Sequence, residues 1–218
     1  FHEAINILER FDVWKKVPRS ISKVLSDGAK GLIQETPKKN DPIFKKVNNI
    51  VIGNNHLACE AAVKELALRG LKTLLLTSFM EGEARSIGSV LAALAEEIVT
   101  SGNPVPPPVG IVAGGETTVT VTGNGVGGRN QEICLSAALK LDGIERSVLV
   151  SVSTDGVDGP TDAAGAIVDG STISRSKGMG LNAEDYLRKN DSYSFFSRMD
   201  DLIFTGRTGT NVNDISIL

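Results

Sequence analysis

Two glycine-rich stretches hold most of the residues that could do chemistry. They are residues 114–132 (GGETTVTVTGNGVGGRNQE) and residues 153–165 (STDGVDGPTDAAG), and each follows an apolar run that we expect to be a strand. Glycine lets the backbone approach a ligand closely, and acidic and arginine side chains supply charge where the ligand arrives. This combination predicts a phosphate and metal site.

The first stretch contains a candidate phosphate site. Residues 123–128 match G-x-G-x-x-G ahead of a predicted helix, which alone is a weak sign of dinucleotide binding. That helix opens with polar residues, and an arginine there suits a phosphate held on helix N-terminal amides. The residues predicted to bind phosphate are Gly125, Gly127, Gly128, Arg129 and Asn130. The alternative is a glycine-rich hairpin or helix entry with a surface arginine.

The second stretch contains a candidate metal site. Asp155, Asp158 and Asp162 are spaced three and four residues apart, directly after a predicted strand. The EF-hand pattern is absent, whereas Mg²⁺ needs only one or two carboxylates plus substrate phosphates. We expect Asp155 to bind metal or to accept a hydroxyl proton, and Asp158 to be a second metal ligand. Turn and N-cap chemistry is the alternative, and it is favoured for Asp162.

Two further features complete the candidate site. Residues 205–214 (TGRTGTNVND) could bind a small hydroxy acid or phosphate, or could simply form a tight turn. The side chains available there are Thr208, Thr210, Asn211, Asn213 and Asp214. Glu116 follows a glycine pair, thirteen residues before Arg129, so these two could form an ion pair. No histidine lies near the acidic stretches, which leaves a Ser-His-Asp triad without support.

The elements that must position these residues alternate between strand and helix. Strands are predicted at residues 50–53, 72–77, 109–113, 117–122, 147–153 and 212–217, and helices at 56–69, 83–100, 129–140, near 171 and at 182–189. The alternation predicts a three-layer α/β/α domain with a mostly parallel, mixed six-stranded sheet. Residues 114–116 are too few for a parallel crossover, so an antiparallel pair or a sharp bend is expected there. Ligands bind such sheets at the carboxyl ends of strands.

The first 46 residues differ in character from the rest. They hold ten Lys and Arg against six Asp and Glu, in two predicted helices (2–13 and 20–32) and a proline-containing linker (35–46). A solvated helical face explains this basic charge better than a phosphate-binding arm. The remaining residues hold thirteen basic against twenty acidic side chains, which argues against a nucleic-acid surface.

Composition bounds the class of protein. The chain has 218 residues, 41% hydrophobic and 22% charged, and no run approaches the ~20 apolar residues of a membrane span. Cys59 and Cys134 match no metal spacing, so we expect buried thiols and a cytoplasmic protein. Because the chain begins with Phe1 and not with Met, and a predicted helix starts at the next residue, we expect a fragment or a processed product.

Four motifs in order resemble the type-2 glycerate kinases, whose C-terminal part is called the MOFRL domain. They are GGETTV at 114–119, GGRNQE at 127–132, TDGVDGPTDAAGA at 154–166 and TGTNVND at 208–214. The resemblance implies an ATP- and Mg²⁺-dependent kinase that makes 2-phosphoglycerate from D-glycerate between two α/β domains. It implies site roles for Glu116, Arg129 and Asp155, and less defined roles for Asn211 and Asn213. Arg207 stands where the family usually has proline.

The resemblance also implies a domain organisation. Family members are about twice this long, and their N-terminal Rossmann-like domain contributes a catalytic lysine. Residues 1–46 resemble the last helices of that domain, and residues 47–218 its C-terminal partner, with MOFRL motifs from about 109. We therefore expect the chain to be inactive alone. The alternatives are an NAD(P)H-dependent hydroxypyruvate reductase and a non-catalytic phosphate- or nucleotide-binding module, each without nucleic-acid or membrane partners.

Overall fold

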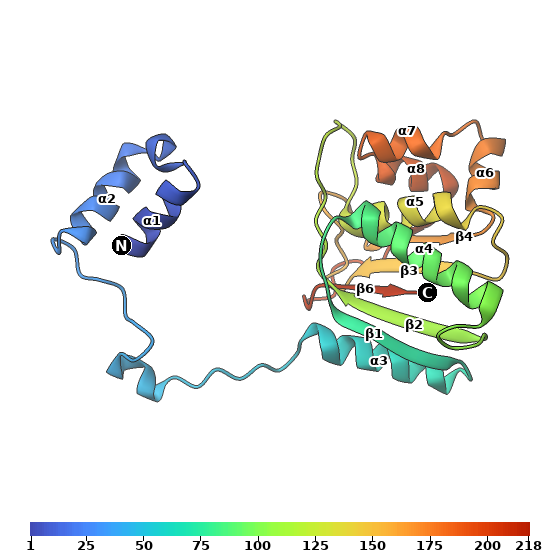
Figure 1. Ribbon diagram of the computed structural model, residues 1–218, viewed down its shortest axis with the longest axis horizontal. Helices are drawn as coiled ribbons and strands as arrows, with labels where there is room; N and C mark the ends of the chain where they lie inside the picture. The colour runs from blue at the N-terminus through green and yellow to red at the C-terminus, as the bar shows by residue number, and fades with distance from the viewer. The chain divides into compact units, whose positions relative to one another are not determined.

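The first of two structural units is a helix pair without a core of its own. The computed structural model describes all 218 residues and divides into Phe1–Ile50 and Val51–Leu218. The first unit contains α1 (His2–Arg10), η1 (Trp14–Lys16), α2 (Arg19–Ala29) and η2 (Pro42–Lys46) (Figure 1). None of the residues of these helices is buried. The predicted strand at 50–53 is wrong, because Ile50, Val51 and Ile52 are all exposed and pair with no strand.

The second unit is built on one mixed sheet of six strands in the order β1-β2-β6-β3-β4-β5. The strands are β1 (Lys72–Met80), β2 (Val109–Gly115), β3 (Val148–Ser153), β4 (Gly165–Asp169), β5 (Leu202–Ile203) and β6 (Asp214–Ile217). The prediction of an α/β fold with a mixed six-stranded sheet is confirmed. The prediction that the sheet is mostly parallel is wrong, since only β1 and β2 pair in parallel. Two of the four antiparallel pairs arise because β6, the last strand in sequence, inserts between β2 and β3, and the other two are β3 with β4 and β4 with β5.

The predicted strand at 117–122 is also wrong, because this β-branched segment finds no strand to pair with. It makes one isolated bridge, between Glu83 and Thr118. Its backbone N–H groups go elsewhere: Thr120 donates to the Glu83 carboxylate at 3.1 Å and Thr122 to Asn190 Oδ1 at 2.9 Å. The two strands that complete the sheet, β4 and β5, were not predicted, and neither was α8 (Ser192–Met199).

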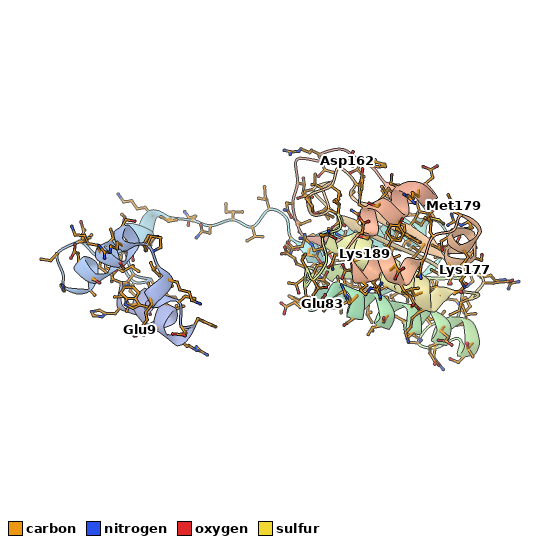
Figure 2. The ribbon with its side chains drawn as sticks, turned by 90° about the horizontal axis from the view of Figure 1, so that it is seen from above. Glu9, Glu83, Asp162, Lys177, Met179 and Lys189 are labelled. Carbon is orange, nitrogen blue, oxygen red and sulfur yellow. The ribbon has the colours of Figure 1, made fainter.

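Helices cover both faces of the sheet (Figure 1). On one face lies α3 (Asn55–Leu68), and on the other lie α4 (Ala84–Ser101) and α5 (Arg129–Leu141). Outside α5 lies a layer of α6 (Thr172–Gly178), α7 (Ala183–Arg188) and α8. Figure 2 shows this layer from above, with Met179 after α6 and Lys189 after α7. None of the helices has the length and apolar content that a membrane crossing requires.

Helix α5 forms the centre of the core. Ten of its thirteen residues are buried, including the polar Asn130, Gln131 and Glu132 of its first turn. Its apolar residues pack with Leu149 of β3 and with Phe195 and Phe196 of α8. Both cysteines are free and buried, as expected. Because α5 is enclosed on all sides, its N-terminus is held in a fixed place relative to the sheet.

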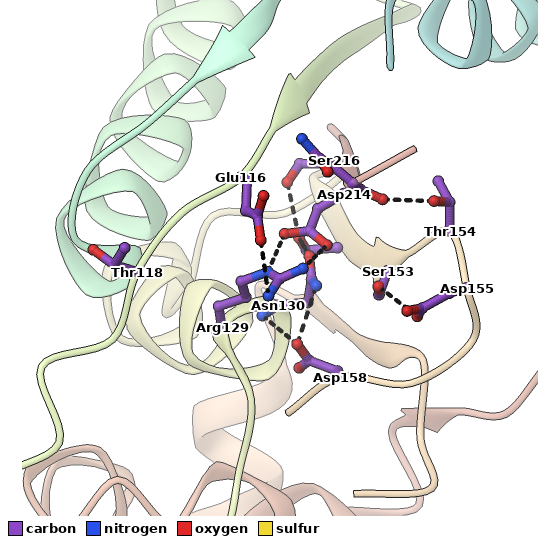
Figure 3. A network of polar contacts seen from close by, with 12 residues as sticks. Glu116, Thr118, Arg129, Asn130, Ser153, Thr154, Asp155, Asp158, Asp214 and Ser216 are labelled. Carbon is purple, nitrogen blue, oxygen red and sulfur yellow. Dashed lines mark hydrogen bonds and ion pairs between the residues drawn. The ribbon is translucent and has the colours of Figure 1, made fainter. Parts of the chain in front are cut away.

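The strand directions bring three chain segments to one edge of the sheet. Strands β2 and β3 run the same way with β6 antiparallel between them, so Gly115 and Ser153, at the ends of β2 and β3, both face Asp214 at the start of β6. The segments that carry Glu116, Asp155 and residues 205–213 therefore start or end at this edge. The N-terminus of α5 lies beside it (Figure 3).

We predict that Gly88→Ala destabilises the second unit. Helices α4 and α5 approach closely there, and a Cβ on Gly88 would lie 2.2 Å from the backbone oxygen of Ile133. Backbone cannot yield as a side-chain end does, so overpacking should lower the free energy of unfolding by about 2 kcal/mol, measured by urea denaturation. The matched control is Gly178→Ala, where nothing lies within 4 Å of the new Cβ. Equal stability of the two variants would contradict close packing of α4 on α5.

Candidate active site

Arg129 is the first residue of α5, and a buried carboxylate fixes its guanidinium. Arg129 Nε and Nη2 donate to the two carboxylate oxygens of Asp214, the Nη2 bond measuring 3.0 Å. The side chain of Asp214 is 1% exposed, while that of Arg129 is 27% exposed. The hydrogen bonds to Asp214 raise the pKa of Arg129 above its ordinary value. The guanidinium is therefore charged, oriented and open to solvent on one side.

Glu116 approaches the same guanidinium from the end of β2. Its Oε1 lies 3.5 Å from Arg129 Nη1, which bears out the ion pair that the spacing allowed (Figure 3). Glu116 is 54% exposed, so this contact is weaker than that to Asp214. Arg129 thus has one buried and one solvent-exposed carboxylate partner.

Asp155 lies two residues beyond β3 and is held by short contacts. Its Oδ1 accepts hydrogen bonds from Ser153 Oγ at 2.8 Å and from the Val157 N–H at 2.9 Å. Its Oδ2 accepts one from Asn211 Nδ2 at 3.2 Å. The hydrogen bond from the Val157 N–H is the main cause that lowers the pKa of Asp155 below its usual value. The Ser153 hydroxyl and the Arg129 charge act in the same direction, and together the three outweigh the effect of burial. Asp155 is therefore an ionised, half-buried carboxylate.

Asp158 faces inward and caps α5. Its carboxylate accepts from the N–H and Nδ2 of Asn130, both at 3.1 Å, and from the Gln131 N–H at 2.9 Å. Asp158 is 1% exposed, and burial raises its pKa although these donors act in the opposite direction. The helix N-terminal amides that we expected to hold a phosphate are thus occupied within the protein.

Asn130 likewise serves the interior. It is fully buried, and its Oδ1 accepts a hydrogen bond of 2.7 Å from Ser151 Oγ of β3. Ser151 Oγ in turn lies 2.8 Å from Ser216 Oγ of β6. This chain of contacts ties the first turn of α5 to the two central strands and so fixes the base of the Arg129 side chain.

The glycine-rich loop packs against the junction of α7 and α8. A Cβ on Gly125 would lie 2.3 Å from Asp191, and one on Gly127 would lie 2.2 Å from Ser192. A Cβ on Gly128 would lie 2.2 Å from the carboxylate carbon of Asp158. These glycines therefore allow close internal packing, and their Cα atoms face other residues of the chain.

Residues 205–213 form a loop that leans on the end of β3. Thr208 Oγ1 donates to the Thr154 carbonyl at 2.6 Å, and Thr154 Oγ1 donates to the Asn213 carbonyl at 2.7 Å. The Thr210 N–H donates to Thr208 Oγ1 at 3.2 Å, and Thr210 itself is exposed. The loop thereby places Asn211 against Asp155. Asp162 lies apart from this cluster, bound to Tyr193 Oη at 2.7 Å.

The cluster has an excess of negative charge. Glu116, Asp155 and Asp214 contribute three carboxylates and Arg129 one guanidinium, which leaves two net negative charges. No group of three or more His, Cys, Asp or Glu side chains is arranged to hold a metal ion by itself. An anionic ligand would meet Arg129 favourably only if a further cation balanced the carboxylates.

A cavity of about 480 Å³ opens beside Glu116. It lies between the end of β1 with its following turn and the segment after β2. We call it the Glu116 cavity, and its lining consists of Ser78, Phe79, Met80, Glu81, Gly82, Gly115, Glu116, Thr117, Thr118 and Asn213. The cluster around Arg129 and this cavity share Glu116.

Comparison with known proteins assigns the family. Residues 109–214 match the MOFRL family. The chain contains a MOFRL family domain. Along its whole length it is 44% identical to a glycerate 2-kinase of Pyrococcus horikoshii, of which it spans 49%. It is 41% identical, over 76% of its length, to a protein of Agrobacterium vitis named a candidate hydroxypyruvate reductase, of which it spans 43%.

A solved structure supports the same assignment. The crystal structure of glycerate kinase from Thermotoga maritima superposes with a TM-score of 0.84 at 40% identity, covering 99% of this chain and 49% of that one. The resemblance to the C-terminal portion of the type-2 glycerate kinases is therefore confirmed. The chain spans about half the length of the relatives it matches.

The MOFRL domain uses two residues whose roles the sequence did not reveal. Asp214 was one of several polar residues in its stretch, with no sign that it pairs with Arg129, 85 positions away. Glu132 is 2% exposed, pairs with Arg85 at 2.8 Å and accepts from Asn190 Nδ2 at 3.0 Å. A charged residue amid an apolar helical face was the available signal for Glu132. Nothing in the spacing could indicate either partner.

We predict that Asp214→Asn costs more stability than a matched change elsewhere. The variant keeps the shape but removes the charge that balances Arg129, and breaking a buried pair typically costs about 3 kcal/mol. Because Arg129 is 27% exposed, we expect a loss of about 2 kcal/mol in the free energy of unfolding, measured by urea denaturation.

The control is Asp201→Asn. Asp201 accepts from Arg175 through both oxygens, at 3.2 and 2.8 Å, but Arg175 is 41% exposed. Solvent should screen that pair and limit its loss to about 1 kcal/mol. If Asp201→Asn lowered the free energy of unfolding as much as Asp214→Asn, burial of the Arg129–Asp214 pair would not explain its contribution to stability.

Proposed function

We propose that this chain is the C-terminal portion of a glycerate 2-kinase, which transfers a phosphoryl group from ATP to the 2-hydroxyl of D-glycerate. The observation that carries the proposal is the oriented Arg129 guanidinium beside the ionised Asp155 at the carboxyl ends of β2 and β3. Phosphoryl transfer needs little more from a protein than positioning and charge stabilisation, and these residues supply both. The names of the Pyrococcus and Thermotoga relatives agree with this reaction class.

In this proposal Arg129 receives phosphoryl oxygens. Its bidentate contact with Asp214 leaves the outer edge of the guanidinium for a ligand. Glu116 is the exposed partner that an incoming phosphate would displace or share. Asn211 holds Asp155, Asn213 and Thr210 shape the loop, and Gly125, Gly127, Gly128 and Asn130 fix the start of α5.

The carboxylate excess fits a divalent cation. Mg²⁺ typically takes one or two carboxylates and completes its shell with water and substrate phosphates, so a full protein cage is unnecessary. Asp155 is the ligand we favour, since Asp158 already accepts three hydrogen bonds from α5. When bound, Mg²⁺ would neutralise charge on the nucleotide phosphates.

Asp155 could alternatively accept the proton of the glycerate hydroxyl. A general base works best with a pKa near the operating pH, whereas the pKa of Asp155 is lowered. We therefore assign Asp155 to metal binding, and the two roles make different predictions.

We predict that Asp155→Asn raises the Mg²⁺ concentration needed for half-maximal activity by at least about tenfold, as expected for loss of a metal ligand or its partners. Saturating Mg²⁺ should restore a measurable part of kcat. The control is Asp162→Asn, which lies outside the cluster. A fall in kcat with an unchanged Mg²⁺ dependence would contradict metal binding and indicate that Asp155 acts as the general base.

The domain organisation is part of the same proposal. Residues 1–46 would be the end of an N-terminal Rossmann-like domain and residues 47–218 the C-terminal domain, with the active site between two domains. The two uncompensated negative charges support this, since a lysine from the first domain would balance one of them. The chain alone would then be inactive. A cytoplasmic location, with reduced Cys59 and Cys134, belongs to the same proposal.

The experiment is a coupled assay for ADP release with Mg·ATP and D-glycerate. It compares this chain with a version joined to the N-terminal half of the Thermotoga relative. We expect activity only in the joined protein, and identification of the product as 2-phosphoglycerate by NMR. Oxidation of NADH by hydroxypyruvate, with no ADP release, would instead support the reductase that the Agrobacterium relative's name indicates.

A further inference from the structure

We propose that the Glu116 cavity is the nucleoside subsite of the enzyme, where the base and ribose of the nucleotide bind. This inference rests on the proposed kinase function, which brings a nucleoside triphosphate to the protein. The cavity has a volume of about 480 Å³, within the range of small-ligand sites, and is the cavity that shares a residue with the Arg129 cluster.

The cavity is built into the sheet. Strands β1 and β2 pair regularly as far as Leu75, after which the register shifts twice before Met80. The segment after β2 is then fastened to the turn after β1 by two backbone hydrogen bonds. The Glu116 N–H donates to the Met80 carbonyl at 2.9 Å, and the Thr118 N–H donates to the Gly82 carbonyl at 2.8 Å. The walls are therefore held in place within the chain itself.

The charge of the lining selects the ligand. Glu81 and Glu116 are acidic, and no Lys or Arg lines the cavity. Carboxylates repel the carboxylate of glycerate and the phosphates of a nucleotide. They accept hydrogen bonds from hydroxyl groups such as those of ribose. Ser78 and Thr118 add hydroxyls to the same lining.

Phe79 adds an aromatic side chain to the lining. It is 83% exposed, so its ring is accessible to a ligand in the cavity. Bases stack on exposed aromatic rings, and such stacking tolerates any base. Of the groups in the proposed reaction, the nucleoside alone is uncharged, hydroxylated and aromatic. A nucleoside in the cavity would place its phosphates past Glu116, toward Arg129.

The test uses kinetics of the complete kinase. Phe79→Ala should raise KM for ATP at least about fivefold, the loss expected for one stacked base, with kcat and KM for glycerate within twofold of the original. Glu81→Gln should also raise KM for ATP. The matched control is Met179→Ala, an apolar side chain 55% exposed after α6 and outside the cavity, which should leave both KM values unchanged.

Photolabelling locates the base directly. We expect 8-azido-ATP to label peptides that contain residues 78–82 or 115–118, and adenosine, but not glycerate, to compete. Labelling elsewhere, or an unchanged KM for ATP in an active Phe79→Ala enzyme, would overturn the subsite and leave the kinase intact. A protein that is labelled at the cavity but never phosphorylates glycerate would overturn the proposed function and keep the nucleoside site.

Discussion

The pairing of Arg129 with the buried Asp214 carboxylate is the interaction on which the site depends. A carboxylate that is 1% exposed would be costly without a charged, hydrogen-bonded partner. Asp214 begins β6 and lies in register with the last residues of β2 and β3. The same residue therefore sets the edge where the strands meet and the direction of the arginine. Sheet topology and site chemistry cannot change independently here.

A second constraint divides the polar residues into two groups with different tasks. Asn130, Asp158 and Asp214 are buried and use their polar atoms within the protein. Glu116, Arg129 and Asp155 keep part of their surface open at the same edge. The buried group holds the start of α5 on the central strands, and the open group stays free to meet a ligand. A site with this division needs little rearrangement to bind a charged group, as the proposed phosphoryl transfer requires.

The local sequence pattern predicted many of the helices and strands but little of the order in which the strands pair. Residues 129–140 were predicted as a helix and residues 147–153 as a strand, and they form α5 and β3 within a residue of the predicted bounds. Residues 117–122 had strong β propensity, yet a strand also needs a partner, and their N–H groups found side chains instead. Strand β4 was not predicted because it begins with Gly165 and Ala166, directly after turn residues. The position of β6 depends on contacts that no local pattern encodes.

The candidate site shows the same limit at the level of single residues. The motif G-x-G-x-x-G indicated a dinucleotide loop, but each of its glycines would place a Cβ within 2.3 Å of other protein atoms. Gly128 is glycine because the Asp158 carboxylate needs that space to reach α5, and this explains the spacing without any cofactor. In a Rossmann fold the helix N-terminus stays free for pyrophosphate, whereas here Asp158 fills it. The motif therefore gives the reductase hypothesis no structural support. Arg129, which the same loop positions, remains the residue that we propose to bind phosphate.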